Sequence, residues 1–499
     1  MRTHSSRRRG FGTAAALLAT CLIAAATAPG ARADEAAPMY QPNTVDVIHL
    51  TLPPESIVAL ESEPDEYVPG TFSLAETEGT PGTEKAPSTP LSVEIRLKGN
   101  VKGSFRSLAG KAAFKVKFKK SQKFLGLRKM TLNNMVDDPS QIHETLAYSA
   151  FRGAGVPAPR TGYAYLFVNG EDFGLHLNIE TVDVVALEKW FGVFHEPPQH
   201  LYEGEDGVDV RPGEALAFEI DEGKEEERAD LEALIGAVNT AAPAFSPRVA
   251  GFADLGEMTR MWAVEKYIGD WDSYSGQQGE ALPNNYYLYS DPAGRFQMIP
   301  WGADQTWEPG HRLQFDGQAG LLFDDCLEDP ACATTYRESL RAATVEIASL
   351  DLSGLGERTA ALLLPWEQME QSNSRHEHNV EEIEAAVEGV HEFIATRPGE
   401  AAAWLATHTP PAIAATGPLP VAPVGCVVPR LKGKNLTSAK NRSRRADCRI
   451  GKVTKKRGAT AKTGKVIKQS PRPGRLLAPG SKVSVWLRGG AQSLVSSHR

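Results

Sequence analysis

The sequence of 499 residues carries 54 lysines and arginines against 62 aspartates and glutamates, giving a formal net charge of −8, and 41% of its residues are hydrophobic. A chain of this length holds about two to four domains. Beyond its first 26 residues, no run approaches the roughly 18 apolar residues that a transmembrane helix needs, which excludes a membrane-spanning body.

The first 33 residues have the pattern of an export signal. Arginines at 7–9 precede an apolar run at 14–26, and Ala31-Arg32-Ala33 has the small residues of a cleavage site at its first and third positions, before Asp34. The arginines fit a twin-arginine signal as well as an ordinary basic region. We therefore expect a signal peptide at 1–33, a mature protein in the cell wall or secreted, and no transmembrane segment after cleavage.

The body that follows mixes strands and helices. Alternating or aromatic-rich runs predict strands, and apolar residues at helical spacing predict helices. The predicted strands are 45–52, 91–97, 113–118, 163–168, 173–179, 285–290 and 295–300, and the predicted helices are 140–153, 255–268 and much of 336–405. Ser140 is the expected N-cap of the first helix, and Asn169-Gly170 the expected hairpin turn. The pattern predicts an α+β body with a β-rich N-terminal part and a helical C-terminal part.

A basic, glycine-containing loop separates the strands at 91–97 and 113–118. It contains Lys98 and Lys102, and Lys115 and Lys117 follow on the next strand. These cations could cover nucleotide phosphates as a kinase glycine-rich loop does, although no G-x-G-x-x-G is present. A solvated lysine face on an edge strand is the structural alternative. Glu144 could pair with one of these lysines or be an ordinary acid in the first turn of a helix.

Residues 268–307 contain the pattern most suggestive of chemistry. Asp272 precedes a glycine-rich insertion, Asn285 begins an aromatic strand, and Asp304 follows the next strand. A hairpin would bring Asn285 and Asp304 together, and oxygen ligands of this kind suit Mg²⁺. Asp272 would then be the catalytic base that orients a hydroxyl, with Asn285 and Asp304 as metal ligands. Turns and caps alone also account for many Asp and Asn residues.

The cysteines and the charge distribution indicate two disulfides and a separate basic tail. Cys326 with Cys332 and Cys426 with Cys448 are expected to form two disulfides in an oxidising compartment. A Pro/Ala linker at 406–425 separates the body from a basic tail. From residue 421 onward, 20 lysines and arginines face a single acid, Asp447. Such a tail suits an anionic polymer as partner, and export argues against nucleic acid.

Between about residues 45 and 307, several motifs together resemble the CotH kinase family of atypical secreted kinases. The matching motifs are Ile95-Arg96-Leu97-Lys98-Gly99-Asn100, Phe114-Lys115-Val116-Lys117-Phe118, Leu132-Asn133-Asn134, Asp138-Pro139-Ser140, Val168-Asn169-Gly170, Phe173-Gly174, Glu180, Asn284-Asn285-Tyr286-Tyr287 and Pro300-Trp301. The resemblance implies a distorted protein-kinase-like fold that binds ATP and Mg²⁺ or Mn²⁺ and phosphorylates protein hydroxyls.

The resemblance also implies roles for single residues. Asp272 resembles the catalytic aspartate, Asn285 and Asp304 the metal ligands, and Lys115 or Lys117 with Glu144 the lysine–glutamate pair. One departure is that the family commonly has Pro-Trp-Asp-x-Asp where this chain has Gly302 as the third residue. A second is the long segment at 273–283. Either departure could reduce or remove catalysis.

The tail resembles a PASTA module, a small α+β domain associated with cell-wall binding. The matching residues are Val428-Pro429, Leu431, Gly433, Leu436, Ala439, residues 469–474 and residues 483–487. The predicted organisation is a signal peptide at 1–33, a CotH kinase-like domain at 34–405, a linker at 406–425, a PASTA-like domain at 426–490 and a tail at 491–499. An anionic wall polymer or peptidoglycan is the expected partner of the module.

Two functions follow from these observations. The first is a secreted, wall-associated kinase that transfers the γ-phosphate of ATP to protein hydroxyls. The alternative is a catalytically inactive, kinase-like surface protein that the basic module fixes to the wall. A glycan hydrolase would need the carboxyls of Asp272 and Asp304 about 5–10 Å apart across a sugar groove, and we do not favour it.

Overall fold

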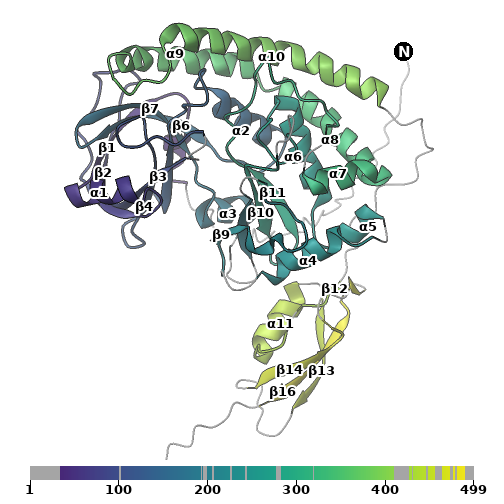
Figure 1. Cartoon of the computed structure of the whole chain (residues 1–499). Coiled ribbons are helices and arrows are strands. Elements are labelled where there is room, and N and C mark those ends of the chain that lie inside the picture. The colour runs from purple at the N-terminus through teal and green to yellow at the C-terminus, as the bar shows by residue number, and fades with distance from the viewer. Residues whose placement is uncertain are drawn as a thin grey trace, which may run out of the picture.

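The described part of the chain comprises the body and the C-terminal module (Figure 1). The computed structural model describes residues 34–99, 103–192, 194, 199–204, 207–224, 228–241, 244–276, 282–317, 320–408, 426–429, 431–445, 448–455, 464–472, 476–477 and 480–488. The predicted signal peptide, most of the predicted linker and the predicted tail lie outside these residues. The proposed domain boundaries therefore stay predictions.

The N-terminal part of the body is a closed seven-stranded barrel. Its strands are β1 (Val45–Thr51), β2 (Val68–Ala75), β3 (Leu91–Lys98), β4 (Ala113–Phe118), β5 (Lys129–Asn133), β6 (Thr161–Val168) and β7 (Glu171–Ile179), in the spatial order β1-β2-β3-β4-β5-β7-β6. The parallel pairing of β1 with β6 closes the barrel, and its other pairs are antiparallel. Closure leaves β4 between two neighbours, so its lysines do not lie on an edge strand as the structural alternative assumed.

The alternation predicted for β4 is confirmed. Phe114, Val116 and Phe118 are buried in the barrel core, while Lys115 and Lys117 are only partly buried. The Phe118 ring packs edge-on against Phe72 of β2, with 5.2 Å between the ring centroids. Because successive side chains of a strand point to opposite faces, the apolar residues fill the barrel and the lysines face outward. A short helix, α1 (Pro54–Ser62), connects β1 to β2.

Helix α2 (His143–Gly153) follows the barrel strand β5 and begins later than predicted. Ser140 is not its N-cap. Asp138 instead accepts a hydrogen bond from the His143 backbone N–H at 2.8 Å, and the Ser140 hydroxyl donates to Asp138. The carboxylate thus satisfies a free N–H group at the helix start. The predicted hairpin between β6 and β7 is confirmed, with Asn169 and Gly170 both at positive φ in its turn.

A second, four-stranded sheet lies in the rest of the body, in the order β11-β10-β8-β9. Its strands are β8 (His200–Gly204), β9 (Glu219–Glu222), β10 (Tyr286–Ser290) and β11 (Phe296–Pro300). The predicted pairing of the last two is confirmed, with Tyr286 opposite Pro300. Every residue of β10 is buried, since this strand lies between β11 and β8, and helix α6 packs against β11.

Helices make up most of the remaining body. They are α3 (Val184–Phe191), α4 (Ala229–Val238), α5 (Phe245–Val249), α6 (Leu255–Ile268), α7 (Leu321–Glu328), α8 (Pro330–Ala348), α9 (Leu352–Glu370) and α10 (Val380–Thr407), besides the short 3-10 helices η1 (Ala37–Tyr40) and η2 (Glu214–Leu216). Helices α9 and α10 run side by side, and α9 contacts β7 of the barrel while α10 contacts α8 (Figure 1). This helical pair therefore joins the two parts of the body.

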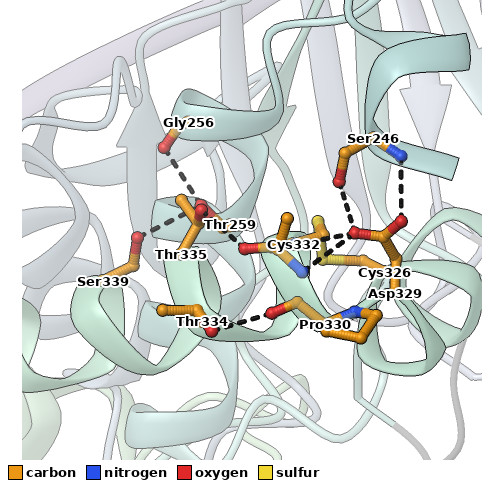
Figure 2. Close-up of a disulfide and its surroundings, with 11 residues drawn as sticks. Ser246, Gly256, Thr259, Cys326, Asp329, Pro330, Cys332, Thr334, Thr335 and Ser339 are labelled. Atoms are coloured by element: carbon orange, nitrogen blue, oxygen red, sulfur yellow. Dashed lines mark hydrogen bonds between the residues drawn. A yellow bond between two sulfur atoms is a disulfide. The ribbon is translucent and has the colours of Figure 1, made fainter. Parts of the chain in front are cut away.

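The predicted disulfide between Cys326 and Cys332 is present at the junction of α7 and α8. Figure 2 shows Asp329 beside it, accepting hydrogen bonds from the backbone N–H of Cys332 and the hydroxyl of Ser246. Asp329 is the N-cap of α8, so the bridge and the cap together fix the start of this helix. Cys448 is also disulfide-bonded. The side chain of Cys426, its predicted partner, lies outside the described part.

The C-terminal module is a small α+β unit. It contains β12 (Cys426–Val427), α11 (Leu436–Arg445), β13 (Arg449–Lys455), β14 (Lys465–Ser470), β15 (Leu476–Leu477) and β16 (Lys482–Arg488). The central strand β16 pairs with β13 and β14, and its residues Val483, Val485 and Leu487 pack with Leu436 and Ala439 of α11. Within the described ranges, none of the helices has the length and apolar character that a membrane crossing needs.

Candidate active site

Three charged side chains interact electrostatically where the barrel meets helix α2 and the loop after β11. They are Lys98, Glu144 and Asp304. Lys98 ends β3, Glu144 lies in the first turn of α2, and Asp304 follows β11. Burial lowers the pKa of Lys98, and the carboxylates of Glu144 and Asp304 oppose that shift. Burial raises the pKa of Glu144 and of Asp304, and Lys98 opposes both shifts. The fold thus brings together three residues separated by more than 200 positions in the sequence.

Glu144 is held in place by neutral donors. Its Oε2 accepts a hydrogen bond from Asn133 Nδ2 at 2.6 Å, and its Oε1 accepts one from the Tyr148 hydroxyl at 3.1 Å. Lys98 makes no ion pair with any residue in the described ranges, and its Nζ lies 6.0 Å from the centroid of the Trp301 ring. The ammonium group is therefore close to two carboxylates yet retains its donors for an anionic ligand.

The two other predicted lysines lie further along the barrel. In the register of β3 with β4, Lys98 faces Ala113, Lys115 faces Arg96 and Lys117 faces Glu94. Successive pairs are two residues apart along the strand, which corresponds to about 6.6 Å. Lys115 and Lys117 therefore lie progressively further from the end of β3 that carries Lys98. Lys117 forms an ion pair with Glu94 at 2.9 Å on the outer surface. Of these three lysines, Lys98 has the charge that most strongly opposes the raised pKa of Glu144, and the assignment of Lys115 or Lys117 to a pair with Glu144 stays a prediction.

Asp272 and Asn285 are in direct contact. Asn285 Nδ2 donates to Asp272 Oδ2 at 2.8 Å and to the Asp272 carbonyl at 2.9 Å. Asn284 Nδ2 also donates to the same carboxylate, at 3.1 and 3.2 Å. Two amides thus orient the carboxylate of the predicted catalytic base. The charge of Asp272 contributes to the raised pKa of Asp304, so the two carboxylates lie in one neighbourhood.

Gly302 lies against the amide of Asn285. A Cβ atom at position 302 would lie 2.6 Å from Asn285 Oδ1, and Gly302 has a φ of +52°. Asn285 is itself in the left-handed region, with φ at +54°. A side chain at position 302 would therefore displace Asn285 or strain the backbone. Gly302, which departs from the family pattern, therefore leaves the space that the Asn285 amide needs in its observed conformation.

Side-chain hydrogen bonds to backbone carbonyls connect α2 to the loop that carries Asp304. His143 Nδ1 lies 2.6 Å from the Asp304 carbonyl oxygen, and Trp307 Nε1 donates to the His143 carbonyl at 3.3 Å. A shift of α2 would thus move Glu144 and Asp304 together. His143 and Asn284 were not predicted as site residues, although each is adjacent in sequence to a predicted one, Glu144 and Asn285 respectively.

The donor set fits a divalent cation chemically. Asp304, Asp272 and the amide oxygen of Asn285 are hard oxygen donors of the kind that Mg²⁺ prefers. Burial and, after it, the negative charge of Glu144 raise the pKa of Asp304 strongly, while the positive charge of Lys98 opposes this shift. Added positive charge would therefore stabilise these carboxylates. No group of three or more His, Cys, Asp or Glu side chains in the described ranges is arranged as a metal site.

Two family models match the chain. The CotH kinase protein model matches residues 95–400, and the PASTA domain model matches residues 427–489. Both agree with the resemblance inferred from the motifs, and the α+β fold class is confirmed.

Two spore coat relatives are similar to parts of this chain. Inner spore coat protein H of Bacillus subtilis (strain 168) is 25% identical over 236 residues, which is 46% of this chain and 62% of that protein. An inner spore coat protein H-like protein of the same organism is 37% identical over 100 residues, covering 17% and 32% of the two chains. The chain thus spans less than two thirds of each of these relatives.

A solved structure was also compared with the chain. The complex of the toxin–antitoxin proteins HipA and HipB with operator DNA, from Shewanella oneidensis MR-1, has a chain that aligns over 74% of both sequences, with 13% identity and a TM-score of 0.29.

Proposed function

This chain belongs to the CotH kinase protein family, and on that premise we propose that it transfers the γ-phosphate of ATP to a hydroxyl group of a protein. The observation that carries the proposal is the proximity of Lys98, Glu144 and Asp304, with Asp272 contributing to the same electrostatic environment. Phosphoryl transfer depends mainly on positioning and on stabilising negative charge, and this set of residues is suited to both tasks.

In this proposal Lys98 binds the phosphates of the nucleotide. Its ammonium group is a compact donor of three hydrogen bonds and makes no ion pair with another described residue. Glu144, fixed by Asn133 and Tyr148, holds the neighbouring negative charge in place and favours the charged form of Lys98. Lys115 lies close enough to affect the pKa of Lys98 and would add positive charge nearby.

Asp272 is proposed to receive the proton of the acceptor hydroxyl. The hydroxyl oxygen forms a bond to the γ-phosphorus, the bond from that phosphorus to the bridging oxygen breaks, and ADP leaves with the electron pair. Asn284 and Asn285 keep the Asp272 carboxylate in one orientation through their amide groups. A fixed carboxylate near the attacking oxygen is the geometry that general-base assistance requires.

Asn285 and Asp304 are the residues we propose to hold Mg²⁺ or Mn²⁺. The Asn285 amide nitrogen is engaged with Asp272, so its oxygen remains as the donor toward a cation. When bound, the cation would neutralise charge on the phosphate oxygens. His143 fixes the carbonyl of Asp304 and thereby the backbone that carries this ligand.

We further propose that the protein acts outside the cell, held at the cell wall by its C-terminal module. The signal-like first 33 residues, the PASTA match and the excess of basic residues after position 420 support this location. An anionic wall polymer or peptidoglycan would be the partner of the module, and a protein the substrate of the body. Nucleic acid is not part of the proposal.

A lysine comparison tests the proposed reaction. The protein from Asp34 onward is incubated with labelled ATP, Mg²⁺ or Mn²⁺ and a protein acceptor, beside the variants Lys98→Met and Lys117→Met. We expect Lys98→Met to lower transfer by about 100-fold or more, because a preorganised charge at the reacting phosphates is lost. Lys117→Met should retain transfer, since Lys117 pairs with Glu94 on the barrel surface. Equal losses in both variants would contradict the role of Lys98.

The second candidate function is a catalytically inactive, kinase-like surface protein. The observation that favours it is Gly302, which leaves one carboxylate fewer than the family pattern provides. For such a protein, ATP with Mg²⁺ or Mn²⁺ would give no label transfer and no thermal stabilisation, whereas a nucleotide-binding kinase would be stabilised according to ligand concentration.

A further inference from the structure

Glu203 is a charged residue near the site that the proposed mechanism does not use. It lies on β8, opposite Tyr287 of β10, and the two side chains form a hydrogen bond. Tyr202, its neighbour in the strand, points to the other face and donates to Asp230 instead. The alternation of the strand thus places Glu203 and Tyr287 on one face of the second sheet.

This face of the sheet leads to the proposed phosphate site. Tyr287 packs edge-on against Trp301, with 5.7 Å between the ring centroids, and Lys98 lies over the Trp301 ring. The carboxylate of Glu203 also acts directly on the pKa of Lys98. Glu203 and Lys98 are thus close in space although they belong to different sheets.

The charge of Glu203 is not neutralised by a direct partner. The carboxylate forms no ion pair with a residue in the described ranges, and it is only partly buried. Burial and the charge of Asp221 raise its pKa to about 7, while Lys115 opposes the shift. The Tyr287 hydroxyl stabilises the charged form to a smaller extent than Lys115 does, and a carboxylate can accept more hydrogen bonds than this one.

The chemistry of the ligand follows from the two opposite charges. A carboxylate would repel phosphates, so the part of a nucleotide that meets Glu203 must be uncharged and rich in donors. The ribose is covalently adjacent to the phosphates and presents two neighbouring hydroxyls. A single acidic side chain often accepts hydrogen bonds from ribose hydroxyls in nucleotide-binding proteins of other folds.

We propose that Glu203 is the specificity residue for the sugar, accepting hydrogen bonds from the 2′ and 3′ hydroxyls of a nucleotide whose phosphates bind at Lys98. This inference rests on the proposed function, because it assumes nucleotide binding at that lysine. It also assigns a task to Tyr287, which positions the carboxylate through its hydroxyl.

Nucleotide analogues test the proposal without a measurement of activity. Thermal stabilisation of the full-length protein is titrated with ATP and with 2′,3′-dideoxy-ATP in Mg²⁺ at pH 8, where the Glu203 carboxylate is mostly ionised. The wild type should bind ATP about 10-fold or more tightly than the dideoxy analogue, since hydrogen bonds to a charged acceptor are lost. Glu203→Gln should bind the two nucleotides with more similar affinities, while Glu232→Gln, an exposed acid on α4, should discriminate like the wild type.

The outcomes separate this inference from the proposed function. ATP binding without discrimination between the two sugars overturns the role of Glu203 and leaves the kinase proposal intact. The role of Glu203 is also overturned if Glu203→Gln prefers ATP over the dideoxy analogue as strongly as the wild type does. A variant that instead loses discrimination between ATP and GTP would assign Glu203 to the base and refute the sugar assignment. Absence of any stabilisation of the wild type by ATP would overturn both proposals.

Discussion

At the scale of single residues, Asn285 and Gly302 form a matched pair. Both have positive φ, and the Asn285 amide oxygen occupies the space that a side chain at position 302 would need. The sequence motif alone presents Gly302 as a lost carboxylate. The structure gives the glycine a conformational reason, because it lets Asn285 reach Asp272 while keeping its own oxygen toward the loop of Asp304.

Substitution of Gly302 distinguishes these interpretations. Gly302→Asp should destabilise the body by about 1–3 kcal/mol, because an L-residue is forced into a strained backbone region against Asn285. Unfolding in urea measures the change. Gly310→Ala, in the same loop with open space around it, should change stability much less. A stable Gly302→Asp protein with faster phosphoryl transfer would instead identify position 302 as a missing ligand.

Glu257, in the first turn of α6, gives the stability of the body a pH dependence. Its Oε2 accepts a hydrogen bond from the Met298 backbone N–H at 3.0 Å, and burial raises its pKa to about 8 from 4.5. The folded state holds a proton that the unfolded state releases. The corresponding stabilisation is therefore complete below pH 4.5 and is lost as the pH rises toward 8, at up to about 1.4 kcal/mol per pH unit.

A glutamine that mimics the protonated acid should remove this dependence. The melting temperature of Glu257→Gln should exceed that of the wild type by an amount that grows between pH 5 and pH 8. Glu388→Gln, at an exposed position of α10, should follow the wild-type profile. Parallel profiles for wild type and Glu257→Gln would show that Glu257 is ionised in the folded protein.

At the scale of elements, a buried ion pair connects the barrel to α9. Lys111 Nζ lies 2.5 Å from Glu370 Oε1, and the two side chains are 3% and 4% exposed. Glu370 also accepts from the Leu175 backbone N–H at 3.0 Å, and Asn134 donates to the Lys111 carbonyl. Lys111 follows the basic loop that begins at Lys98, so α9 stabilises one end of that loop.

Removal of one partner of this pair should be costly. Lys111→Met leaves the Glu370 carboxylate buried without its cation, and we expect a loss of about 3–5 kcal/mol in the free energy of unfolding. The comparison is Lys85→Met, whose partner Glu76 lies at 2.8 Å but whose pair is 62% and 65% exposed. That variant should lose much less stability, because both charges stay in water when the pair is broken. Similar losses in both would indicate that burial does not control the strength of this pair.

At the scale of the whole molecule, the charges divide between its two folded parts. Residues 34–420 contain 61 acidic and 29 basic residues, whereas residues 421–499 contain one acidic and 20 basic residues. On β16 of the module, the buried Val483, Val485 and Leu487 alternate with the outward residues Lys482, Trp486 and Arg488. Lys468 of β14 lies over the Trp486 ring, 5.3 Å from its centroid. The sheet face opposite α11 is therefore cationic.

This separation of charge predicts salt-sensitive attachment. The full-length protein should co-sediment with a phosphate-rich wall polymer at low salt and be released toward about 1 M NaCl, where charges are screened beyond roughly 3 Å. A chain that ends at residue 420 should not sediment and should keep the melting transition of the body. Attachment that survives high salt, or that persists in the shortened chain, would contradict an electrostatic role of the module.

Several features of the fold followed from local sequence patterns. The helix at Leu255–Ile268, the strand at Ala113–Phe118 and the Asn169-Gly170 turn agree with predictions made from periodicity and turn chemistry. These features depend on neighbouring residues, so a single sequence contains the necessary information. The predicted start of α2 was wrong. Ser140 is a typical N-cap residue, but in the structure the Asp138 carboxylate accepts the hydrogen bond from the backbone N–H at the helix start.

By itself, the sequence determined the residue types of the site, the family and the charge of each part. Only the tertiary structure decided that the barrel closes, that Lys98 lies where its charge acts on Glu144, and that Gly302 lies against Asn285. These outcomes depend on strand register and on packing between segments far apart in the chain. Local propensities do not specify such contacts, because the contacts form only when the whole core is assembled.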